Sequence, residues 1–133
     1  MTTARSTFNQ HSFKKGDKVF LFKSWNGFEK SCITYYIQEY TIHSIGKKQC
    51  YLIIGDDMLS KNAFYCNFPY GIASSQEEAI QLCNQLMDEE IAKQIADYEW
   101  RKDNWKNYSE IADRIIANCK TAKREIIFNP YND

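Results

Sequence analysis

The sequence contains few side chains that could catalyse a reaction. His43 and Cys50 stand at symmetric positions about Gly46-Lys47, so a two-residue turn would place them opposite each other on paired strands. A Cys–His pair can serve as nucleophile and base, or as half of a zinc site. No other cysteine or histidine stands at metal-ligand spacing, and the glycines form no phosphate-binding loop. We therefore expect no catalytic, cofactor or metal site and predict that the protein is not an enzyme.

Lysines and aromatic residues in the first half of the chain could instead bind nucleic acid. Every basic residue between positions 13 and 73 is a lysine. Lysines neutralise phosphates, and aromatic rings stack on unpaired bases. Arginine is the residue favoured for bidentate recognition of bases, so its absence here speaks against sequence-specific binding. The sequence indicates nucleic-acid binding as an alternative function, with the candidate residues Lys23, Lys47 and Lys48.

The stretch DYEWRKDNWKNYSE, residues 97–110, interleaves aromatic and charged side chains. In a helix, at about 100° per residue, Trp100 falls about 180° from the apolar stripe centred on Ile91, whereas Trp105 falls near that stripe. Either the helix is buried on two sides and the stretch is a joint between helices, or Trp100 faces a partner. The candidate contact residues of this stretch are Trp100, Arg101 and Lys102.

Two further segments could contact a partner. Trp25 and Phe28 flank the turn Asn26-Gly27, which is an unusual place for large apolar side chains. The acidic run Asp88-Glu89-Glu90 is either a solvated helix face or an imitation of a phosphate track that occupies a nucleic-acid-binding groove on another protein. The candidate contacts are therefore Trp25, Phe28, Asp88, Glu89 and Glu90.

Charge is divided unequally along the chain. The whole sequence has 17 basic and 17 acidic residues, but residues 1–73 carry nine Lys/Arg and five Asp/Glu, a net charge of +4. Residues 74–133 carry eight and twelve, a net charge of −4. Two oppositely charged layers could neutralise each other, or one of them could meet a charged partner.

The apolar pattern predicts strands in the first part of the chain. Runs rich in β-branched and aromatic residues place them at 19–22, 32–45, 49–54 and within 58–68, with a polar loop at 23–31. Between Ile37 and Tyr40 the alternation changes phase, which predicts an inserted residue or a sharp bend near Gln38–Glu39.

The second part of the chain has helical periodicity. Two overlapping capping boxes, Ser74 with Glu77 and Ser75 with Glu78, predict a helix that runs to about residue 104. A second helix is expected over about 108–125. We expect a flexible tail at 1–12, a β-rich part at 13–73 and a two-helix part at 74–133 that packs on it, as one compact domain.

Composition favours a folded protein in a reducing compartment. Of the 133 residues, 44% are hydrophobic, which is enough to form a core. The five cysteines show no paired spacing, and no apolar run has the length of a signal peptide or membrane span. We expect a cytoplasmic protein that does not bind membranes. The oligomeric state is left open.

The run FKKGDKVFLF, residues 13–22, resembles the beginning of SH3-like barrels of the Tudor and KOW type. The resemblance implies a small barrel that binds peptides, proteins or nucleic acid. The predicted fold is α+β: a small bent antiparallel sheet or SH3-like barrel followed by two packed α-helices. In type the chain also resembles small accessory proteins of phages and mobile elements, some of which inhibit defence complexes such as CRISPR effectors. The leading hypothesis is a non-enzymatic module that binds another protein or complex, as an inhibitor of a host nucleic-acid-processing or defence machine.

Overall fold

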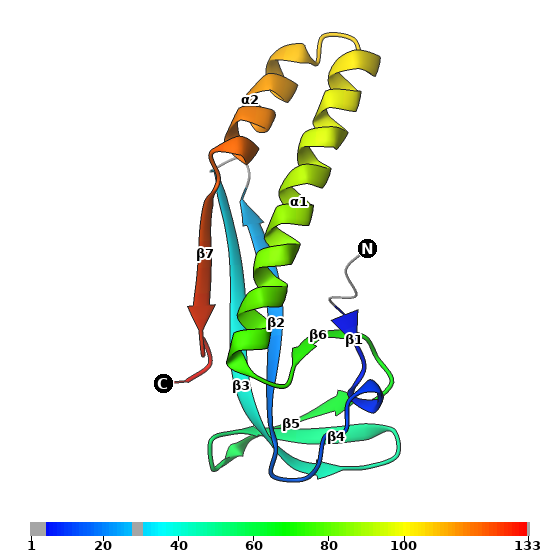
Figure 1. Ribbon diagram of the computed structural model, residues 1–133, viewed down its shortest axis with the longest axis vertical. Helices are drawn as coiled ribbons and strands as arrows, with labels where there is room; N and C mark the ends of the chain where they lie inside the picture. The colour runs from blue at the N-terminus through cyan, green and yellow to red at the C-terminus, as the bar shows by residue number, and fades with distance from the viewer. Residues whose placement is uncertain (1–4, 28–30, 133) are drawn as a thin grey trace.

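The computed structural model describes residues 5–27 and 31–132. Over these residues the chain forms seven strands, two α-helices and one short 3₁₀ helix. In chain order they are β1 (Arg5–Ser6), η1 (Phe8–Gln10), β2 (Lys18–Gly27), β3 (Cys32–Ile45), β4 (Gln49–Ile54), β5 (Asp57–Tyr65), β6 (Tyr70–Ala73), α1 (Gln76–Asn104), α2 (Ser109–Lys120) and β7 (Lys123–Phe128). The predicted α+β class is confirmed, and the described strands form an open sheet rather than a closed barrel (Figure 1).

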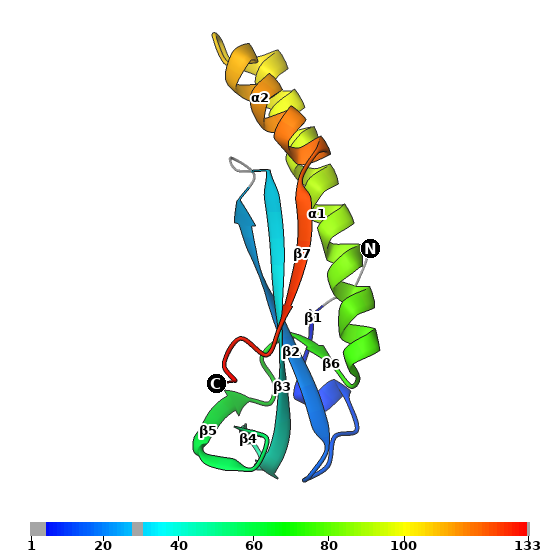
Figure 2. The same ribbon diagram turned by 90° about the vertical axis from the view of Figure 1, so that its left-hand side faces the viewer.

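Strand β3 is the centre of the sheet. The strand order is β1-β6-β2-β3-β4-β5, and all these neighbours are antiparallel. β7 returns after the helices and pairs in parallel with Cys32–Ile37 of β3, while β4 pairs with Thr41–Ile45. Figures 1 and 2 show β2 and β3 as a long bent ribbon, with β7 beside its upper part and β4–β5 folded across its lower end.

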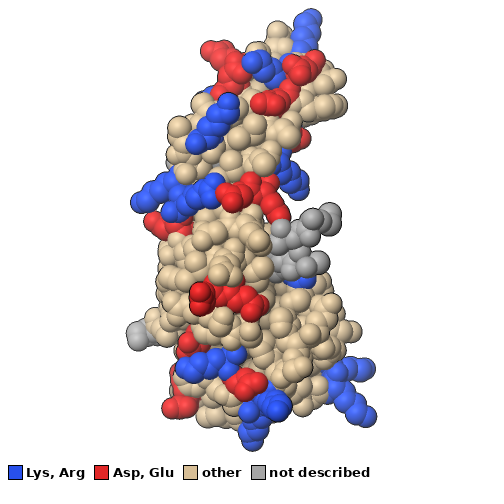
Figure 3. Space-filling view, in the orientation of Figure 1, with Lys and Arg blue, Asp and Glu red and all other residues tan. Residues whose placement is uncertain are grey.

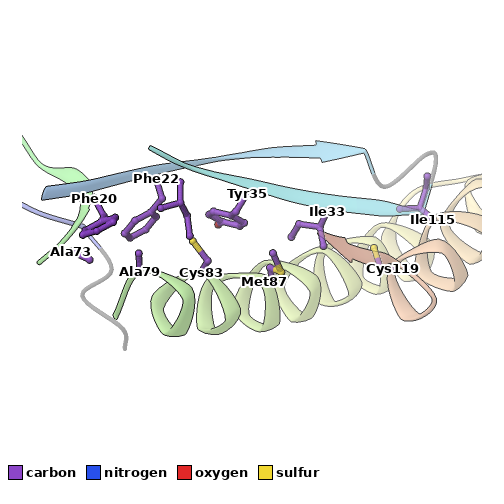
Figure 4. Close-up of a cluster of buried hydrophobic side chains, with 11 residues drawn as sticks. Phe20, Phe22, Ile33, Tyr35, Ala73, Ala79, Cys83, Met87, Ile115 and Cys119 are labelled. Carbon is purple, nitrogen blue, oxygen red and sulfur yellow. The ribbon is translucent and has the colours of Figure 1, made fainter. Parts of the chain in front are cut away.

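The two faces of this ribbon are buried by different parts of the chain. One face packs against α1 and α2 in a cluster that we call the sheet–helix core (Figure 4). Its buried members are Phe20, Phe22, Ile33, Tyr35, Ile37, Ala73, Ala79, Cys83, Met87, Ile115 and Cys119. The second core is built by the N-terminal segment and strands β2 to β6, and its buried members are Phe8, Val19, Tyr40, Ile42, Cys50, Leu52, Cys66 and Ile72.

The phase change in β3 reflects this switch of the buried face. Ile37 belongs to the sheet–helix core, whereas Tyr40 belongs to the second core. The register between β2 and β3 runs without interruption from Lys18–Thr41 to Gly27–Cys32. The predicted insertion near Gln38–Glu39 is therefore wrong, because successive side chains still alternate and only the covering elements change.

Helix α1 begins where the sequence predicts. Ser75 is its N-cap, and the Ser75 Oγ accepts a hydrogen bond from the Glu78 backbone N–H at 3.1 Å. Ala79, Cys83 and Met87 then follow at four-residue spacing, so they lie on one face, and all three are fully buried against the sheet. No helix among residues 5–27 and 31–132 combines the length and apolar composition needed to cross a membrane.

Three predicted boundaries are wrong. β2 continues to Gly27, so residues 23–27 are strand rather than loop. The second helix ends at Lys120, and residues 123–128 return to the sheet as β7 instead of extending the two-helix part. The N-terminal segment is not a free tail from residue 5 onward, because Arg5 and Ser6 pair with β6 and Phe8 is buried.

Candidate functional site

Two exposed tryptophans lie where α1 ends: Trp100 is in the last turns of the helix, and Trp105 is its C-cap. Figure 1 shows that this end of α1, with the turn into α2, forms one end of the molecule. The Trp100 side chain is 56% exposed and Trp105 is 46% exposed. Neighbouring exposed apolar side chains can mark a contact surface, and this makes the location of the two tryptophans informative. We refer to Asp97, Tyr98, Trp100, Arg101, Trp105 and Tyr108 as the hairpin tip.

Arg101 holds the hairpin tip together. Its Nη2 lies 3.0 Å from the Asp97 carboxylate one turn earlier, and its Nη1 donates to the Tyr108 hydroxyl at 3.4 Å. The guanidinium also lies over the rings of Tyr98 and Trp105, at 4.6 Å and 5.0 Å from their centroids. The hydrogen bond with Tyr108 and the Asp97 charge raise the pKa of Arg101 above its ordinary value, so both contacts favour the cation that an arginine carries in any case.

The aromatic rings of the tip pack on one another. Trp100 meets Trp105 edge-on with 6.5 Å between centroids, and Trp105 meets Tyr108 in the same way at 5.0 Å. The Trp100 carbonyl accepts a hydrogen bond from the Asn104 side chain at 2.8 Å. Asn107 adopts a left-handed conformation with φ of 60°, which an asparagine tolerates and which turns the chain into α2. Arg101 and Tyr108 therefore hold the Trp105 ring, whereas the Trp100 ring has, among the described residues, only its edge contact with Trp105 and is open to water.

The structure tests the burial of Trp100 but not its contact with a partner. Trp100 faces solvent, so the interpretation in which the helix is buried on two sides at this point is wrong. The predicted joint between the two helices is present nearby, where the rings of Tyr98 and Tyr108 stack with their centroids 6.3 Å apart. Lys102 ties the two helices together through Asp113, with 2.7 Å between Nζ and the carboxylate. Arg101 therefore holds the aromatic rings of the tip together, and Lys102 fixes the end of α1 against α2.

Sequence reasoning singled out this stretch but missed the roles of Asp97 and Tyr108. The spacing of Asp97 and Arg101, four residues apart on a helix, is the signal that could have identified their ion pair. Tyr108 lies across the turn on the next helix start, so no local pattern connects it to Arg101.

One residue of the acidic run, Asp88, joins α1 to β7. Asp88 forms an ion pair with Arg124 of β7, and the Glu90 carboxylate accepts a hydrogen bond from Gln94 at 3.2 Å. Figure 3 shows acidic and basic groups interspersed on the visible face, both over the helices and near the lower end. The run is thus partly used inside the fold, and its imitation of a phosphate track stays a prediction.

The other predicted contact residues do not join the hairpin tip. Trp25 lies in β2, paired with Thr34, and Phe28 lies outside the described residues. Among the lysines, Lys23 lies opposite Tyr36 in the middle of the β2–β3 ribbon. Lys47 and Lys48 follow the end of β3, roughly 30 Å along the strand from Tyr36 at ~3.3 Å per residue. Lys23 is therefore separate from Lys47 and Lys48, and the three lysines do not form one cluster on the surface.

The Cys50–His43 hypothesis loses its geometric basis. Cys50 pairs with Ile45 rather than with His43, which falls at the register shift between Ile42 and Ser44. Burial, and secondarily the neighbouring Cys66 thiol, raises the pKa of Cys50 to about 12, so the thiol stays protonated at neutral pH. Within residues 5–27 and 31–132, no three His, Cys, Asp or Glu side chains gather as a metal site would require.

Comparison with known protein families, curated proteins and solved structures found no match to this chain. The resemblance of residues 13–22 to SH3-like barrels therefore stays a prediction, and the function must be argued from the geometry alone.

Proposed function

We propose that this chain is a non-enzymatic protein-binding module whose hairpin tip makes the central contact. The observation that carries the proposal is the pair Trp100 and Trp105, both exposed and in edge contact with each other at the end of a helical hairpin. Tryptophan, tyrosine and arginine are the side chains that most often dominate the free energy of protein–protein association. All three types are present within the tip.

The order of the tip favours affinity. A binding surface that must become ordered loses conformational entropy on association, at about 0.5–1.5 kcal/mol for each immobilised side chain. Here Arg101 stacks on the Trp105 ring, and Trp105 in turn contacts the edge of the Trp100 ring, so part of this cost is met before a partner binds. The ion pair between Lys102 and Asp113 adds a polar border, which is the usual surrounding of an apolar contact centre.

The identity of the partner is a separate question. Inhibition of a host nucleic-acid-processing or defence complex remains the sequence-based hypothesis for the role of this contact. The hairpin tip supports binding to a protein surface with an apolar depression that can accept indole rings. Naming the captured partner tests the inhibitor hypothesis.

Quantitative capture with matched variants tests the proposal. Tagged wild-type protein, Trp100→Ala and Trp105→Ala are used to enrich partners from native lysate, with and without nuclease treatment, and mass spectrometry is the readout. Leu59→Ala is the matched control, because Leu59 is 97% exposed but lies in β5, at the opposite end of the molecule from the tip. Each variant is first shown to melt cooperatively.

We expect one protein or complex that wild type and Leu59→Ala enrich equally and that both tryptophan variants lose. Equal enrichment by all four proteins would place the contact elsewhere and contradict the proposal. Enrichment that disappears with nuclease in every case would favour the nucleic-acid alternative instead.

A further inference from the structure

A groove of about 520 Å³ lies over the β2–β3 ribbon, from the middle of the ribbon, where Lys23 pairs with Tyr36, towards β5, and none of its described lining residues belongs to α1 or α2. Its floor includes Leu21, Tyr36 and Gln38 of the β2–β3 ribbon, on the face opposite the sheet–helix core. Its walls come from β5, from the segment before β6, and from the C-terminal turn at Pro130–Tyr131. Figure 2 shows this C-terminal segment close to β5. A volume of this size suits a small molecule rather than a protein surface.

A buried amide anchors the C-terminal wall. Gln38 is only 3% exposed, and its Oε1 accepts a hydrogen bond from the Tyr131 backbone N–H at 3.0 Å, while its Nε2 donates to Asn132 at 2.9 Å. Asn129 turns the chain with φ of 51°, and its side chain accepts from the Glu39 backbone N–H at 3.0 Å. The wall is therefore formed before any ligand arrives.

The groove is lined mainly by aromatic rings. Tyr70 is the hub of one side, with Phe64 at 5.8 Å and Phe68 at 5.1 Å between centroids. Phe68 and Tyr131 come from two separate wall segments and are 51% and 52% exposed. A flat ring placed in the groove would cover apolar surface on both, which favours an aromatic ligand.

The charged side chains that line the groove are all basic. Its lining includes Lys23 and Arg5 and contains no Asp or Glu among the described residues. Lys23 Nζ donates to the Tyr131 hydroxyl at 2.9 Å, and no carboxylate of the described residues lies within ion-pair distance of it. An ammonium group has three N–H donors, so two remain for a ligand. A carboxylate on the ligand would complement this charge.

We propose that the groove binds a small aromatic molecule carrying one carboxylate, with its ring between Phe68 and Tyr131 and its carboxylate at Lys23. The site is independent of the protein contact proposed above, because no residue of α1, α2 or the hairpin tip, all of which the structure describes, lines the groove. Failure to bind a small molecule in the groove would therefore leave the proposed protein contact at the hairpin tip untouched, and the reverse also holds.

Two isosteric probes test both halves of the proposal. The full chain, labelled with ¹⁵N, is titrated with 1-naphthylacetate and with its neutral amide, 1-naphthylacetamide, while backbone amide resonances are followed by NMR. We expect the carboxylate probe to shift the resonances of Lys23, Tyr36 and Tyr131 and to bind about tenfold more tightly than the amide, a difference of ~1.4 kcal/mol.

Three variants separate the charge from the ring. Lys23→Met should remove the preference for the carboxylate, whereas Lys47→Met, at an exposed turn lysine outside the groove, should keep it. Phe68→Ala should weaken both probes together. All three positions are exposed, so the variants should fold. Absence of shifts at the groove, equal affinity for the two probes, or an unchanged preference in Lys23→Met would each overturn the proposal.

Discussion

The two halves of α1 place apolar side chains in opposite environments. In the first half, Ala79, Cys83 and Met87 are fully buried against the sheet. In the second half, Ile91 and Ile95 are partly buried, and Trp100 is more exposed than buried. Figure 1 shows that α1 continues beyond the sheet, where only α2 lies beside it. Burial thus follows the length of the covering sheet rather than the apolar character of the helix.

This difference separates side chains that stabilise the fold from side chains available for contact. Apolar groups in the first half are removed from water by folding itself. The tryptophans of the hairpin tip still have water-exposed surface, and association with a partner can bury it. If this distinction is correct, substitutions in the first half of α1 should lower stability, and substitutions at the hairpin tip should lower affinity for a partner.

The largest expected effect is on the free energy of unfolding when the sheet–helix core is truncated. Ile33 is fully buried beneath α1, so Ile33→Ala should cost about 2–5 kcal/mol through lost burial and the cavity left behind. Ile111→Ala is the matched control, because Ile111 is 42% exposed on α2. Urea unfolding measures both. Similar costs for the two variants would remove the contrast between the regions.

A smaller effect is expected at the second face of the ribbon. Gln38→Leu keeps the apolar bulk but removes the amide that bonds Tyr131 and Asn132, so it should cost about 1–3 kcal/mol and release the C-terminal turn. Hydrogen exchange at the Tyr131 amide should accelerate in this variant. Gln81→Leu, on an exposed position of α1, is the control and should change stability by only about 0.5 kcal/mol. Unchanged exchange at Tyr131 would show that Gln38 does not anchor the groove wall.

The sheet–helix core should also weaken at alkaline pH. Burial raises the pKa of Cys83 from its ordinary value of 9.0 to about 12. Because the native thiol resists ionisation and the unfolded thiol does not, this contribution to stability is fully present below pH 9 and is lost as pH rises from 9 towards 12. Urea midpoints measured from pH 8 to 10.5 should fall less steeply in Cys83→Ala than in wild type. Parallel slopes would contradict the assignment.

Local patterns in the sequence predicted the long elements well. The β-branched and aromatic run of Cys32–Ile45 has no competing helical period, and β3 has those boundaries. Ser75 caps α1, and the helix ends at the predicted residue 104, shortly before Asn107 turns the chain with its left-handed conformation. In both cases the signal lies within one contiguous segment.

Long-range contacts explain what the sequence did not predict. Ile126 continues the helical spacing of Ile115 and Cys119, yet pairing with β3 makes it part of β7. Parallel pairing joins residues about ninety positions apart, and no local pattern encodes it. The groove has the same origin, since its walls come from distant segments that meet only in the folded chain.

Trp100→Ala should change the free energy of unfolding little and the affinity for a partner strongly, and measuring both quantities tests the account most directly. For Trp100→Ala, the free energy of unfolding and the affinity for the captured partner are determined on the same preparation. We predict that stability changes by at most about 1 kcal/mol, since only an edge contact with Trp105 is lost, while affinity falls at least about tenfold. A stability loss of several kcal/mol, or an unchanged affinity, would contradict the account.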